Sequence, residues 1–356
     1  MVEKVLISGN EAIGYGAIYA DCTHYFGYPI TPQNELIEFM AREFPKLGRT
    51  FVQAESEFAS INMVCGAAAT GRRAMTSTSS TAFSLMQEGI SGIAAMELPC
   101  LIVDVQRGGP GAGSTQHSQM DYLLATRGGH GGYKNIVLAP FSVQEGFELT
   151  QLAFYLADKY RIHVILLSDG ILGQMYESVS LEKHEFPSLP EKTWAVKGSA
   201  TNNCQRKFIH NSPGIIGSYY DYMKRSKEKY DKITENEVRY SSYEIEDAEI
   251  ILISYGSTAR IVMEAVQKAR KEGIKAGLFR PVTLWPFPRE HLYKLADKTN
   301  KFLVVEDCMG QMVEDVELAL QGKAKIDLVS SLDRNLPTGS GMIISTKVLE
   351  KIKNML

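Results

Sequence analysis

The motif Gly27-Tyr28-Pro29-Ile30-Thr31-Pro32 and the downstream motif Gln53-Ala54-Glu55-Ser56-Glu57 are the most informative parts of this sequence. Pro29 and Pro32 each fix one backbone φ angle, remove one N–H donor and favour extended geometry in the residue before them. Thr31 and Pro32 are also typical of a helix N-cap and a first helical position. Apolar residues then recur at helical spacing, at Leu36, Ile37, Met40 and Phe44. We therefore expect a stiff turn that presents Thr31 at a helix N-terminus, where an anion is favoured.

The downstream motif joins an extended segment to a helix. Residues 50–53 have the composition of a strand, and the alanine-rich run 58–69 has that of a buried helix. A carboxylate at the start of such a helix either caps it or is held there for chemistry. Glu55 and Glu57 both occupy that place, and a turn that serves only to start a helix would also account for the first motif.

Three motifs, 28–32, 53–57 and 106–110, resemble the pyrimidine-domain (α) subunit of the 2-oxoacid:ferredoxin oxidoreductases, which are thiamine-diphosphate enzymes. The similarity extends over nearly all of the chain, through residues 9–12, 87–90, 97–99 and 279–288. Within the family the sequence is most similar to the branched-chain type, which acts on 3-methyl-2-oxobutanoate (2-oxoisovalerate) with coenzyme A and reduces ferredoxin. An oxidoreductase subunit that is active only with partner subunits is the implied function.

The resemblance implies a cofactor-activating role for Glu57. Thiamine loses its C2 proton with the help of its own 4′-imino group, and a carboxylic acid bonded to N1′ stabilises that imino form. An enzyme that activates thiamine therefore needs one glutamate in a dry pocket. Glu57 resembles that residue by its place in the motif, and Glu55, two positions earlier on an extended segment, stays an alternative. Tyr28, Pro29 and Ile30 are implied cofactor contacts.

The substrate carboxylate has to be neutralised and oriented. Arg107 follows the apolar run 101–105, a predicted buried strand, and so lies at the carboxyl end of a strand, where α/β sheets bind ligands. Its guanidinium offers a planar fork to a carboxylate, and Thr31 offers a hydroxyl. The resemblance also assigns Thr31 and Arg107 to substrate recognition, whereas a salt-bridged loop arginine is the structural alternative.

Length, composition and charge narrow the possible functions. The 356 residues are 44% hydrophobic and 22% charged, enough for two cores, and the net charge of −3 gives no case for nucleic acid or an anionic membrane as partner. No apolar run of membrane-spanning length occurs and a strand is predicted at 4–8, so we expect a cytoplasmic protein. Five single cysteines predict reduced thiols and no iron–sulfur cluster on this chain.

Short β-branched runs alternate with helical segments, which predicts a doubly wound parallel sheet covered on both faces, an α/β fold. We assign residues 1–185 to a pyrimidine-type thiamine-diphosphate-binding domain. Predicted strands are 4–8, 50–53, 74–78, 101–105, 136–139 and 163–168, and predicted helices are 10–25, 58–69, 83–95 and 142–160.

Residues 186–246 have a different composition and are predicted to cross between domains, with one charged helix at about 219–232. Residues 247–356 resemble a smaller transketolase C-terminal-like α/β domain, whose first helix we expect Thr258 to cap. Its usual role is assembly. Trp285, Phe287 and Glu306 are therefore assigned to packing, and no catalytic residue is placed in it.

Two other motifs are incomplete. Gly14-Tyr15-Gly16 lacks the third glycine of a dinucleotide fingerprint, and Ser168-Asp169-Gly170 with Asn202-Asn203 departs from the Gly-Asp-Gly…Asn-Asn diphosphate signature in its first residue and its spacing. We therefore expect no metal on this chain and a thiamine diphosphate that is shared with a partner. The resemblance implies a β subunit carrying the diphosphate site, Mg²⁺ and a [4Fe–4S] cluster, with γ and ferredoxin-like δ subunits.

Several residues leave alternatives open. His117 and His130 could orient substrate or coenzyme A, or could be ordinary loop residues. The turn Ser79-Ser80-Thr81-Ala82 stands where relatives usually have proline and glycine, so its cofactor contacts are uncertain. A 2-oxoglutarate-specific α subunit and a non-catalytic assembly subunit of the same fold are the alternative functions.

Overall fold

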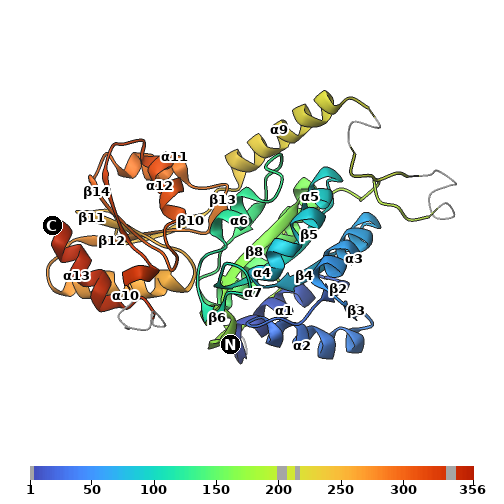
Figure 1. Cartoon of the computed structure of the whole chain (residues 1–356), viewed down its shortest axis with the longest axis horizontal. Coiled ribbons are helices and arrows are strands. Elements are labelled where there is room, and N and C mark those ends of the chain that lie inside the picture. Colours follow the sequence, from blue (N-terminus) through green and yellow to red (C-terminus); the bar gives the residue numbers. More distant parts are fainter. Residues whose placement is uncertain (1–3, 199–206, 213–216, 334–341) are drawn as a thin grey trace.

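The computed structural model describes residues 4–198, 207–212, 217–333 and 342–356, which form two α/β units side by side (Figure 1). The larger unit is built on an eight-stranded sheet. In spatial order the strands are β13 (Thr283–Trp285), β7 (Ile136–Leu138), β8 (His163–Asp169), β5 (Cys100–Gly108), β4 (Ala74–Thr78), β2 (His24–Gly27) and β3 (Thr50–Gln53), with β6 (Ser114–His117) antiparallel to β5. The six neighbouring strands from β7 to β3 in this order run parallel.

Helices cover both faces of this sheet. One face packs against α1 (Gly9–Tyr19), α2 (Asn34–Glu43) and α7 (Val143–Tyr160). The other packs against α3 (Glu57–Ala69), α4 (Thr81–Leu85), α5 (Gln87–Ala95) and α6 (Tyr122–Arg127). Along β5, Leu101 and Val103 enter the first core and Ile102 enters the second. The predicted doubly wound sheet is confirmed.

The smaller unit has a five-stranded sheet in the order β10 (Tyr240–Tyr243), β12 (Ala276–Pro281), β11 (Ile250–Ile253), β14 (Lys301–Val305) and β15 (Lys325–Val329). Its strands are parallel except for β10. One face packs against α10 (Gly256–Lys271) and α13 (Ser345–Met355), and the other against α11 (Arg289–Leu295) and α12 (Met312–Leu320). The expected second α/β unit is therefore present.

Two strands cross the domain boundaries expected from the sequence. β10 lies in the predicted crossing segment and pairs with β12 of the smaller sheet. β13 lies in the predicted second domain and pairs antiparallel with β7 of the larger sheet. The division at 185 and 246 stays a prediction.

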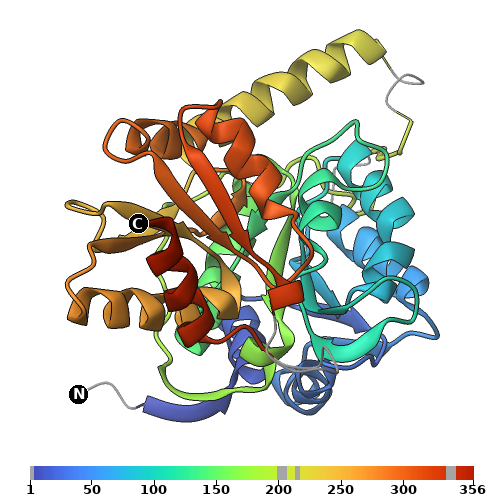
Figure 2. The same ribbon diagram turned by 60° about the vertical axis from the view of Figure 1, so that its left-hand side comes forward.

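The charged helix of the crossing segment is confirmed as α9 (Tyr219–Asn236). Figures 1 and 2 show it projecting beyond the two units, with its C-terminal end against them. At that end Ile233 is buried, and the Tyr230 ring meets Trp285 edge-on with ring centroids 6.0 Å apart. At the other end Tyr219 and Tyr220 are exposed.

Helix α1 ends earlier than the sequence predicted, and a strand was missed. We expected a helix over 10–25, but α1 stops at Tyr19, Asp21 turns at φ +53°, and β2 begins at His24.

The strand expected at 4–8 is present as β1 (Lys4–Ser8), but it pairs antiparallel with β9 (Tyr176–Ser180) in a separate two-stranded sheet.

Two predicted helix starts are also wrong. Helix α2 begins at Asn34, after Gln33, so neither Thr31 nor Pro32 is in its first turn. Gln33 turns its side chain back to the preceding loop instead of capping the helix. Helix α10 begins at Gly256, and Thr258 lies inside it, where its hydroxyl donates to Gln119 Oε1 at 3.0 Å.

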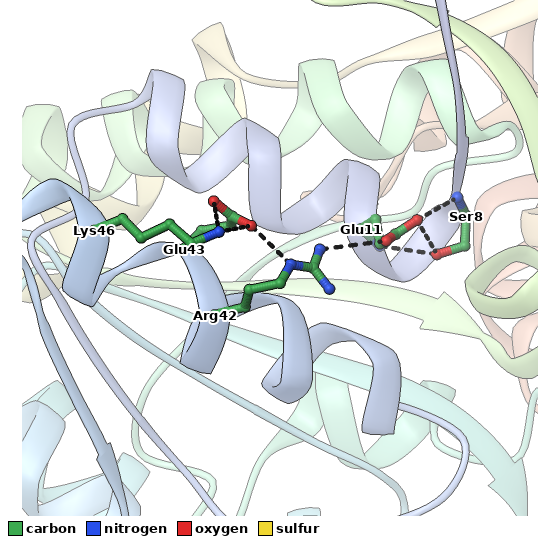
Figure 3. Close-up of polar contacts among 5 residues, drawn as sticks. All are labelled: Ser8, Glu11, Arg42, Glu43 and Lys46. Atoms are coloured by element: carbon green, nitrogen blue, oxygen red, sulfur yellow. Dashed lines mark hydrogen bonds and ion pairs between the residues drawn. The ribbon is translucent and has the colours of Figure 1, made fainter.

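One ion pair joins α2 to α1 beside the apolar packing of the two helices (Figure 3). Glu11 accepts a hydrogen bond from the Ser8 backbone N–H at 3.1 Å in a capping box, and its other oxygen lies 3.6 Å from the Arg42 guanidinium. Arg42 also pairs with Glu43 at 2.7 Å, and Glu43 pairs with Lys46. These contacts, with the apolar face of α2, hold the helix that follows the first motif.

Gln119 is the main polar link between the two units and is 1% exposed. Its backbone N–H donates to Asp307 O at 2.8 Å, and its side-chain amide donates to Tyr255 O at 2.9 Å. Its Oε1 accepts from Thr258 and from the Asp307 N–H. An apolar core shared by the larger sheet and the smaller unit surrounds this residue, so the two units form one packed body.

We expect Gln119→Ala to lower the free energy of unfolding by about 3 kcal/mol, because it leaves several buried polar groups without partners. Gln116→Ala is the matched control: this side chain is exposed on the neighbouring β6, and its loss should change stability by less than about 0.5 kcal/mol. Urea unfolding of the two variants and the wild type measures the difference. Equal midpoints for the two variants would contradict this account of the interface.

Candidate active site

The candidate site residues lie at the carboxyl ends of the parallel strands, which all meet at one side of the larger sheet. The first motif follows β2, Glu57 follows β3, and Arg107 is near the end of β5. The Ala54 N–H donates to Gly27 O at 2.9 Å, so the second motif starts beside the first. Parallel α/β sheets bind their ligands at this side.

A buried hydrogen-bond network holds the turn after β2. Gln33, which is fully buried, donates from Nε2 to Tyr28 O at 3.0 Å. Its Oε1 accepts from the Ser77 hydroxyl at 2.6 Å, and that hydroxyl also meets the Tyr25 hydroxyl at 2.6 Å. Asn10 at the start of α1 donates to Pro32 O at 2.9 Å. The turn is thus fixed from β4 and α1 as well as by its own prolines.

The structure separates Glu57 from Glu55. Glu55 is exposed, whereas Glu57 is 8% exposed and is the first residue of α3, after the N-cap Ser56. Ser56 already caps the helix by accepting the Ala59 N–H at 3.2 Å. No hydrogen bond to the Glu57 carboxylate comes from the described residues. Glu57 is therefore a buried carboxylate that the helix does not need as a cap.

Thr31 and Arg107 are brought together. The Arg107 guanidinium donates through Nη1 to Thr31 O at 2.8 Å and through Nη2 to Ala112 O at 3.0 Å, while its buried Nε lacks a partner in the described part of the chain. The Thr31 hydroxyl accepts from Asn34 Nδ2 at 3.4 Å, so its own proton can be donated elsewhere. Tyr28 and Ile30 are half-buried and Pro29 is exposed.

Three polar residues lie beside Arg107: Ser80, Asp104 and Asp121. The sequence analysis named Ser80 only as part of the turn 79–82 and did not identify the two aspartates. All three are at least 94% buried. The Ser80 N–H donates to Asp104 Oδ1 at 2.9 Å, the Ser80 hydroxyl bonds Asp121, and the Arg107 N–H donates to the Ser80 hydroxyl at 2.9 Å. The signal that could have revealed them is the charge of Asp104 in the middle of the apolar strand 101–105.

The two carboxyl groups of this cluster hold protons unusually tightly. Burial, followed by the charge of Asp121, raises the pKa of Asp104 well above its usual range. Burial also raises the pKa of Asp121 to about 6, although a hydrogen bond from Ser80 and the charge of Arg107 act to lower it. Asp104 Oδ2 has no hydrogen-bond partner among the described residues, and the charge of Asp121 acts on the Asp104 carboxyl. Asp104 is therefore the carboxyl of the pair that keeps its proton, and Asp121 is the one whose pKa of about 6 lies near neutrality.

A cavity of about 370 Å³ opens beside this cluster, between the larger unit and the smaller one. Ser80 and Asp121 contribute polar atoms to its wall, and Met120, Leu124 and Met309 contribute apolar ones. A cavity of about 570 Å³ is lined by Arg73 and Arg161, which precede β4 and β8, so it lies at the amino ends of the strands. It does not include the predicted site residues.

The remaining sequence candidates have structural partners. Asp169 caps α8 (Gly170–Gln174) by accepting the Leu172 N–H at 3.1 Å, and it accepts the Ser257 N–H of α10 at 2.9 Å. Asn202 and Asn203 lie outside the described residues. His117 lies 3.4 Å from Asp307 of the smaller unit, and the exposed His130 bonds Ser91 and Glu88 of α5.

Residues assigned to packing in the smaller unit behave as structural groups. Glu306 is fully buried, and its carboxylate accepts the backbone N–H groups of Gln311, Met312 and Val313 at the start of α12. Phe287 lies in the shared apolar core, and Trp285 packs against it. The described residues include no cluster of three or more His, Cys, Asp or Glu side chains arranged to hold a metal.

Within residues 4–198, 207–212, 217–333 and 342–356, no helix combines the length and apolarity needed to cross a bilayer. The four cysteines in that part of the chain are unpaired, and three of them are buried.

Comparison with known proteins agrees with this geometry. A family model for the pyruvate flavodoxin/ferredoxin oxidoreductase thiamine-diphosphate-binding domain matches residues 15–269, and a model for core domain II of pyruvate:ferredoxin oxidoreductase matches residues 248–342. Fold and site thus define a thiamine-diphosphate-binding α/β protein. The chain belongs to the 2-oxoacid:ferredoxin oxidoreductase family, as the sequence motifs predicted.

Individual relatives are similar over most of their length. The chain is 48% identical to ketoisovalerate oxidoreductase subunit VorB of Methanothermobacter marburgensis, over 93% of this chain and 94% of the relative. It is 38% identical to 2-oxoglutarate synthase subunit KorA of Methanothermobacter thermautotrophicus, over 93% and 95%. A solved 2-oxoglutarate:ferredoxin oxidoreductase from Magnetococcus marinus superposes with a TM-score of 0.85 at 29% identity, over 99% of this chain and 65% of that one.

The raised pKa of Asp121 predicts a pH-dependent contribution to stability. An unfolded aspartate titrates near pKa 3.9, about two units below the folded value of about 6. The protonated form therefore stabilises the fold below about pH 4, and this contribution is lost as the pH rises through about 6. Between about pH 4 and 7 the unfolding free energy of the wild-type chain should fall by roughly 2–3 kcal/mol relative to Asp121→Asn. Urea unfolding at a series of pH values tests this, and parallel curves would contradict it.

Proposed function

We propose that this chain is the α-type subunit of a branched-chain 2-oxoacid:ferredoxin oxidoreductase. The complex would convert 3-methyl-2-oxobutanoate and coenzyme A to an acyl-CoA and CO₂ while it reduces ferredoxin. The observation that carries the proposal is Glu57, a buried carboxylate without a hydrogen-bond partner among the described residues, at the same end of the sheet as Arg107 and Thr31. The 48% identity to a ketoisovalerate oxidoreductase subunit supports the choice of substrate.

Glu57 has the properties required to hold N1′ of the aminopyrimidine. Glu57 is only 8% exposed, and Ser56 leaves its carboxylate free of a capping role. Thiamine diphosphate, when bound, supplies a C2 centre that attacks the 2-oxo group and accepts the electrons of decarboxylation. In this proposal Glu57 shares a proton with N1′, and Tyr28, Pro29 and Ile30 line the adjacent turn.

Arg107 and Thr31 would orient the oxoacid. Arg107 holds Thr31 O and Ala112 O, and its Nε can still donate to a carboxylate. The Thr31 hydroxyl can add a second donor. Arg107 lies near the end of β5 and Glu57 follows β3, and these two strands are three inter-strand spacings apart, about 14 Å.

The proposed complex includes partner subunits. No metal-binding cluster occurs among the described residues, and Asp169 is engaged in capping α8 and α10. We therefore assign the diphosphate site, Mg²⁺ and a [4Fe–4S] cluster to a β subunit, with γ and ferredoxin-like δ subunits completing the path to ferredoxin. The free thiols favour a reducing compartment, the cytoplasm.

In the assembled complex, Glu57→Gln should lower turnover by roughly 10²- to 10⁴-fold, because it removes a positioned proton-transfer group. Glu55→Gln is the matched control: this side chain is exposed two residues away, and its turnover should stay at the wild-type value. Turnover is measured by ferredoxin reduction, and co-purification checks assembly. Equal turnover in the two variants would exclude Glu57 from the mechanism.

Arg107→Ala should raise the KM for the oxoacid by roughly 10- to 100-fold, the effect of losing hydrogen bonds to a charged group. The KM for coenzyme A is the internal control and should not change. If only the coenzyme A value rose, Arg107 would have a different role.

The substrate is decided by a panel of 2-oxoacids offered to the purified complex. Highest kcat/KM for 3-methyl-2-oxobutanoate supports the proposal. The alternative substrate is 2-oxoglutarate, which the 38% identity to a 2-oxoglutarate synthase subunit and the structural match support. A preference of the complex for this dicarboxylate would establish the alternative. A complex that turned over normally without this chain would support the non-catalytic alternative.

A further inference from the structure

Ser80 occupies a backbone conformation that favours glycine. It follows β4 with φ +36° and ψ −90°, in a buried position between the larger sheet and α4. A non-glycine residue at this φ is strained, and the surroundings must compensate for that strain. At Ser80 the compensation is polar: its N–H donates to Asp104 at 2.9 Å, and its hydroxyl reaches Asp121 and the Arg107 backbone.

The hydroxyl links the acid pair to the end of β5. It accepts the Arg107 N–H at 2.9 Å and donates its single proton to Asp121, with Arg107 O a second acceptor at 3.0 Å. The backbone N–H of Asp121 in turn donates to the Gln106 side chain at 3.2 Å. Gln106 and Arg107, near the end of β5, are therefore both linked to Asp121, Gln106 directly and Arg107 through Ser80.

Asp104 completes the arrangement from inside the sheet. Its Oδ1 accepts the Ser80 N–H, and the charge of Asp121 acts on its carboxyl. The groups that face the two acids are Ser80 after β4 and Gln106 and Arg107 of β5. The charge of Arg107 acts on Asp121. Ser80 thus joins Asp104 through its N–H, and Asp121 and the Arg107 backbone through its hydroxyl, in one hydrogen-bonded cluster.

The position of the Arg107 side chain depends on this backbone. Its guanidinium spans two carbonyl oxygens on different loops, Thr31 O and Ala112 O. A shift of about 1 Å at the end of β5 would break that span and misalign the remaining donor with a carboxylate. Loss of the Ser80 hydroxyl would therefore weaken binding of the oxoacid, although Ser80 itself makes no contact with Thr31.

We propose that Ser80, Asp121 and Asp104 are positioning residues, which hold the end of β5 so that Arg107 presents its free donor to the carboxylate of the 2-oxoacid. This rests on the proposed function, because it takes Arg107 as the group that binds the oxoacid. It adds a specific role for Ser80, where a glycine would adopt the same φ without strain but would lack the hydroxyl.

The test compares Ser80→Ala and Ser80→Gly in the assembled complex with 3-methyl-2-oxobutanoate as substrate. Both variants lose the hydroxyl, but glycine also relieves the strain and so keeps the fold. Both should raise the KM for the oxoacid about 10-fold, with kcat changed less than about threefold and the KM for coenzyme A unchanged. Ser178→Ala is the matched control: this exposed serine on β9 makes no side-chain hydrogen bond among the described residues, and the variant should behave as wild type.

A second measurement follows the acid pair. Protonation of Asp121 makes it a poorer acceptor for Ser80, so the wild-type KM for the oxoacid should rise as the pH falls through about 6. Asp121→Asn cannot titrate, and its KM should not show that rise. If Asp121 had only a structural role, Asp121→Asn would change the stability of the protein but would keep the wild-type pH profile of the KM for the oxoacid.

The outcomes separate this inference from the proposed function. A Ser80→Gly complex with wild-type KM, or an Asp121→Asn complex with the wild-type pH profile, would overturn the positioning role. If the wild-type complex preferred 2-oxoglutarate, the proposed substrate would be wrong, but the comparison of variants would still apply, because both acids offer the same carboxylate to Arg107. A complex that oxidised no 2-oxoacid would overturn both.

Discussion

The hydrogen bond from the Arg107 guanidinium to Thr31 O joins the loop after β5 to the turn after β2. These loops are separated by β4, and the bond passes over the end of that strand. This bond requires that both segments are held in place. Gln33 and Asn10 hold the turn after β2, and Ser80 holds the end of β5. The candidate site is therefore determined by buried polar contacts as much as by the residues that would touch a ligand.

The polar groups at this end of the sheet differ in their surroundings. Glu57 is 8% exposed and has no hydrogen-bond partner among the described residues, whereas the buried carboxyls of Asp104 and Asp121 both bond to Ser80. A buried carboxylate is stable only when something compensates for lost hydration. Asp104 and Asp121 receive part of that compensation from Ser80.

The sequence was sufficient for the fold class and for placing Thr31, Glu57 and Arg107 at the same end of the sheet, because motifs and apolar periodicity are local signals. The functional roles of these three residues stay predictions. The sequence failed where a distant partner decided the outcome. Gln33 ends the turn because Ser77 of another strand meets its side chain, and so α2 starts later than Thr31 and Pro32 suggested. β2 was missed although Tyr25 and Phe26 are typical strand residues, because it begins only a short turn after α1. Ser80, Asp104 and Asp121 come from three segments and form a cluster only after folding.

The pairing of β13 with β7 has a consequence for how this polypeptide can be divided. Removal of residues 247–356 would delete β13, the outermost strand of the larger sheet, and leave β7 with unpaired backbone groups. An exposed sheet edge of this kind promotes aggregation. The same removal would also uncover Tyr122, whose ring packs on Tyr255 of the smaller unit. The two units are therefore not separable modules, and gene fusion or fission in such proteins should preserve both together.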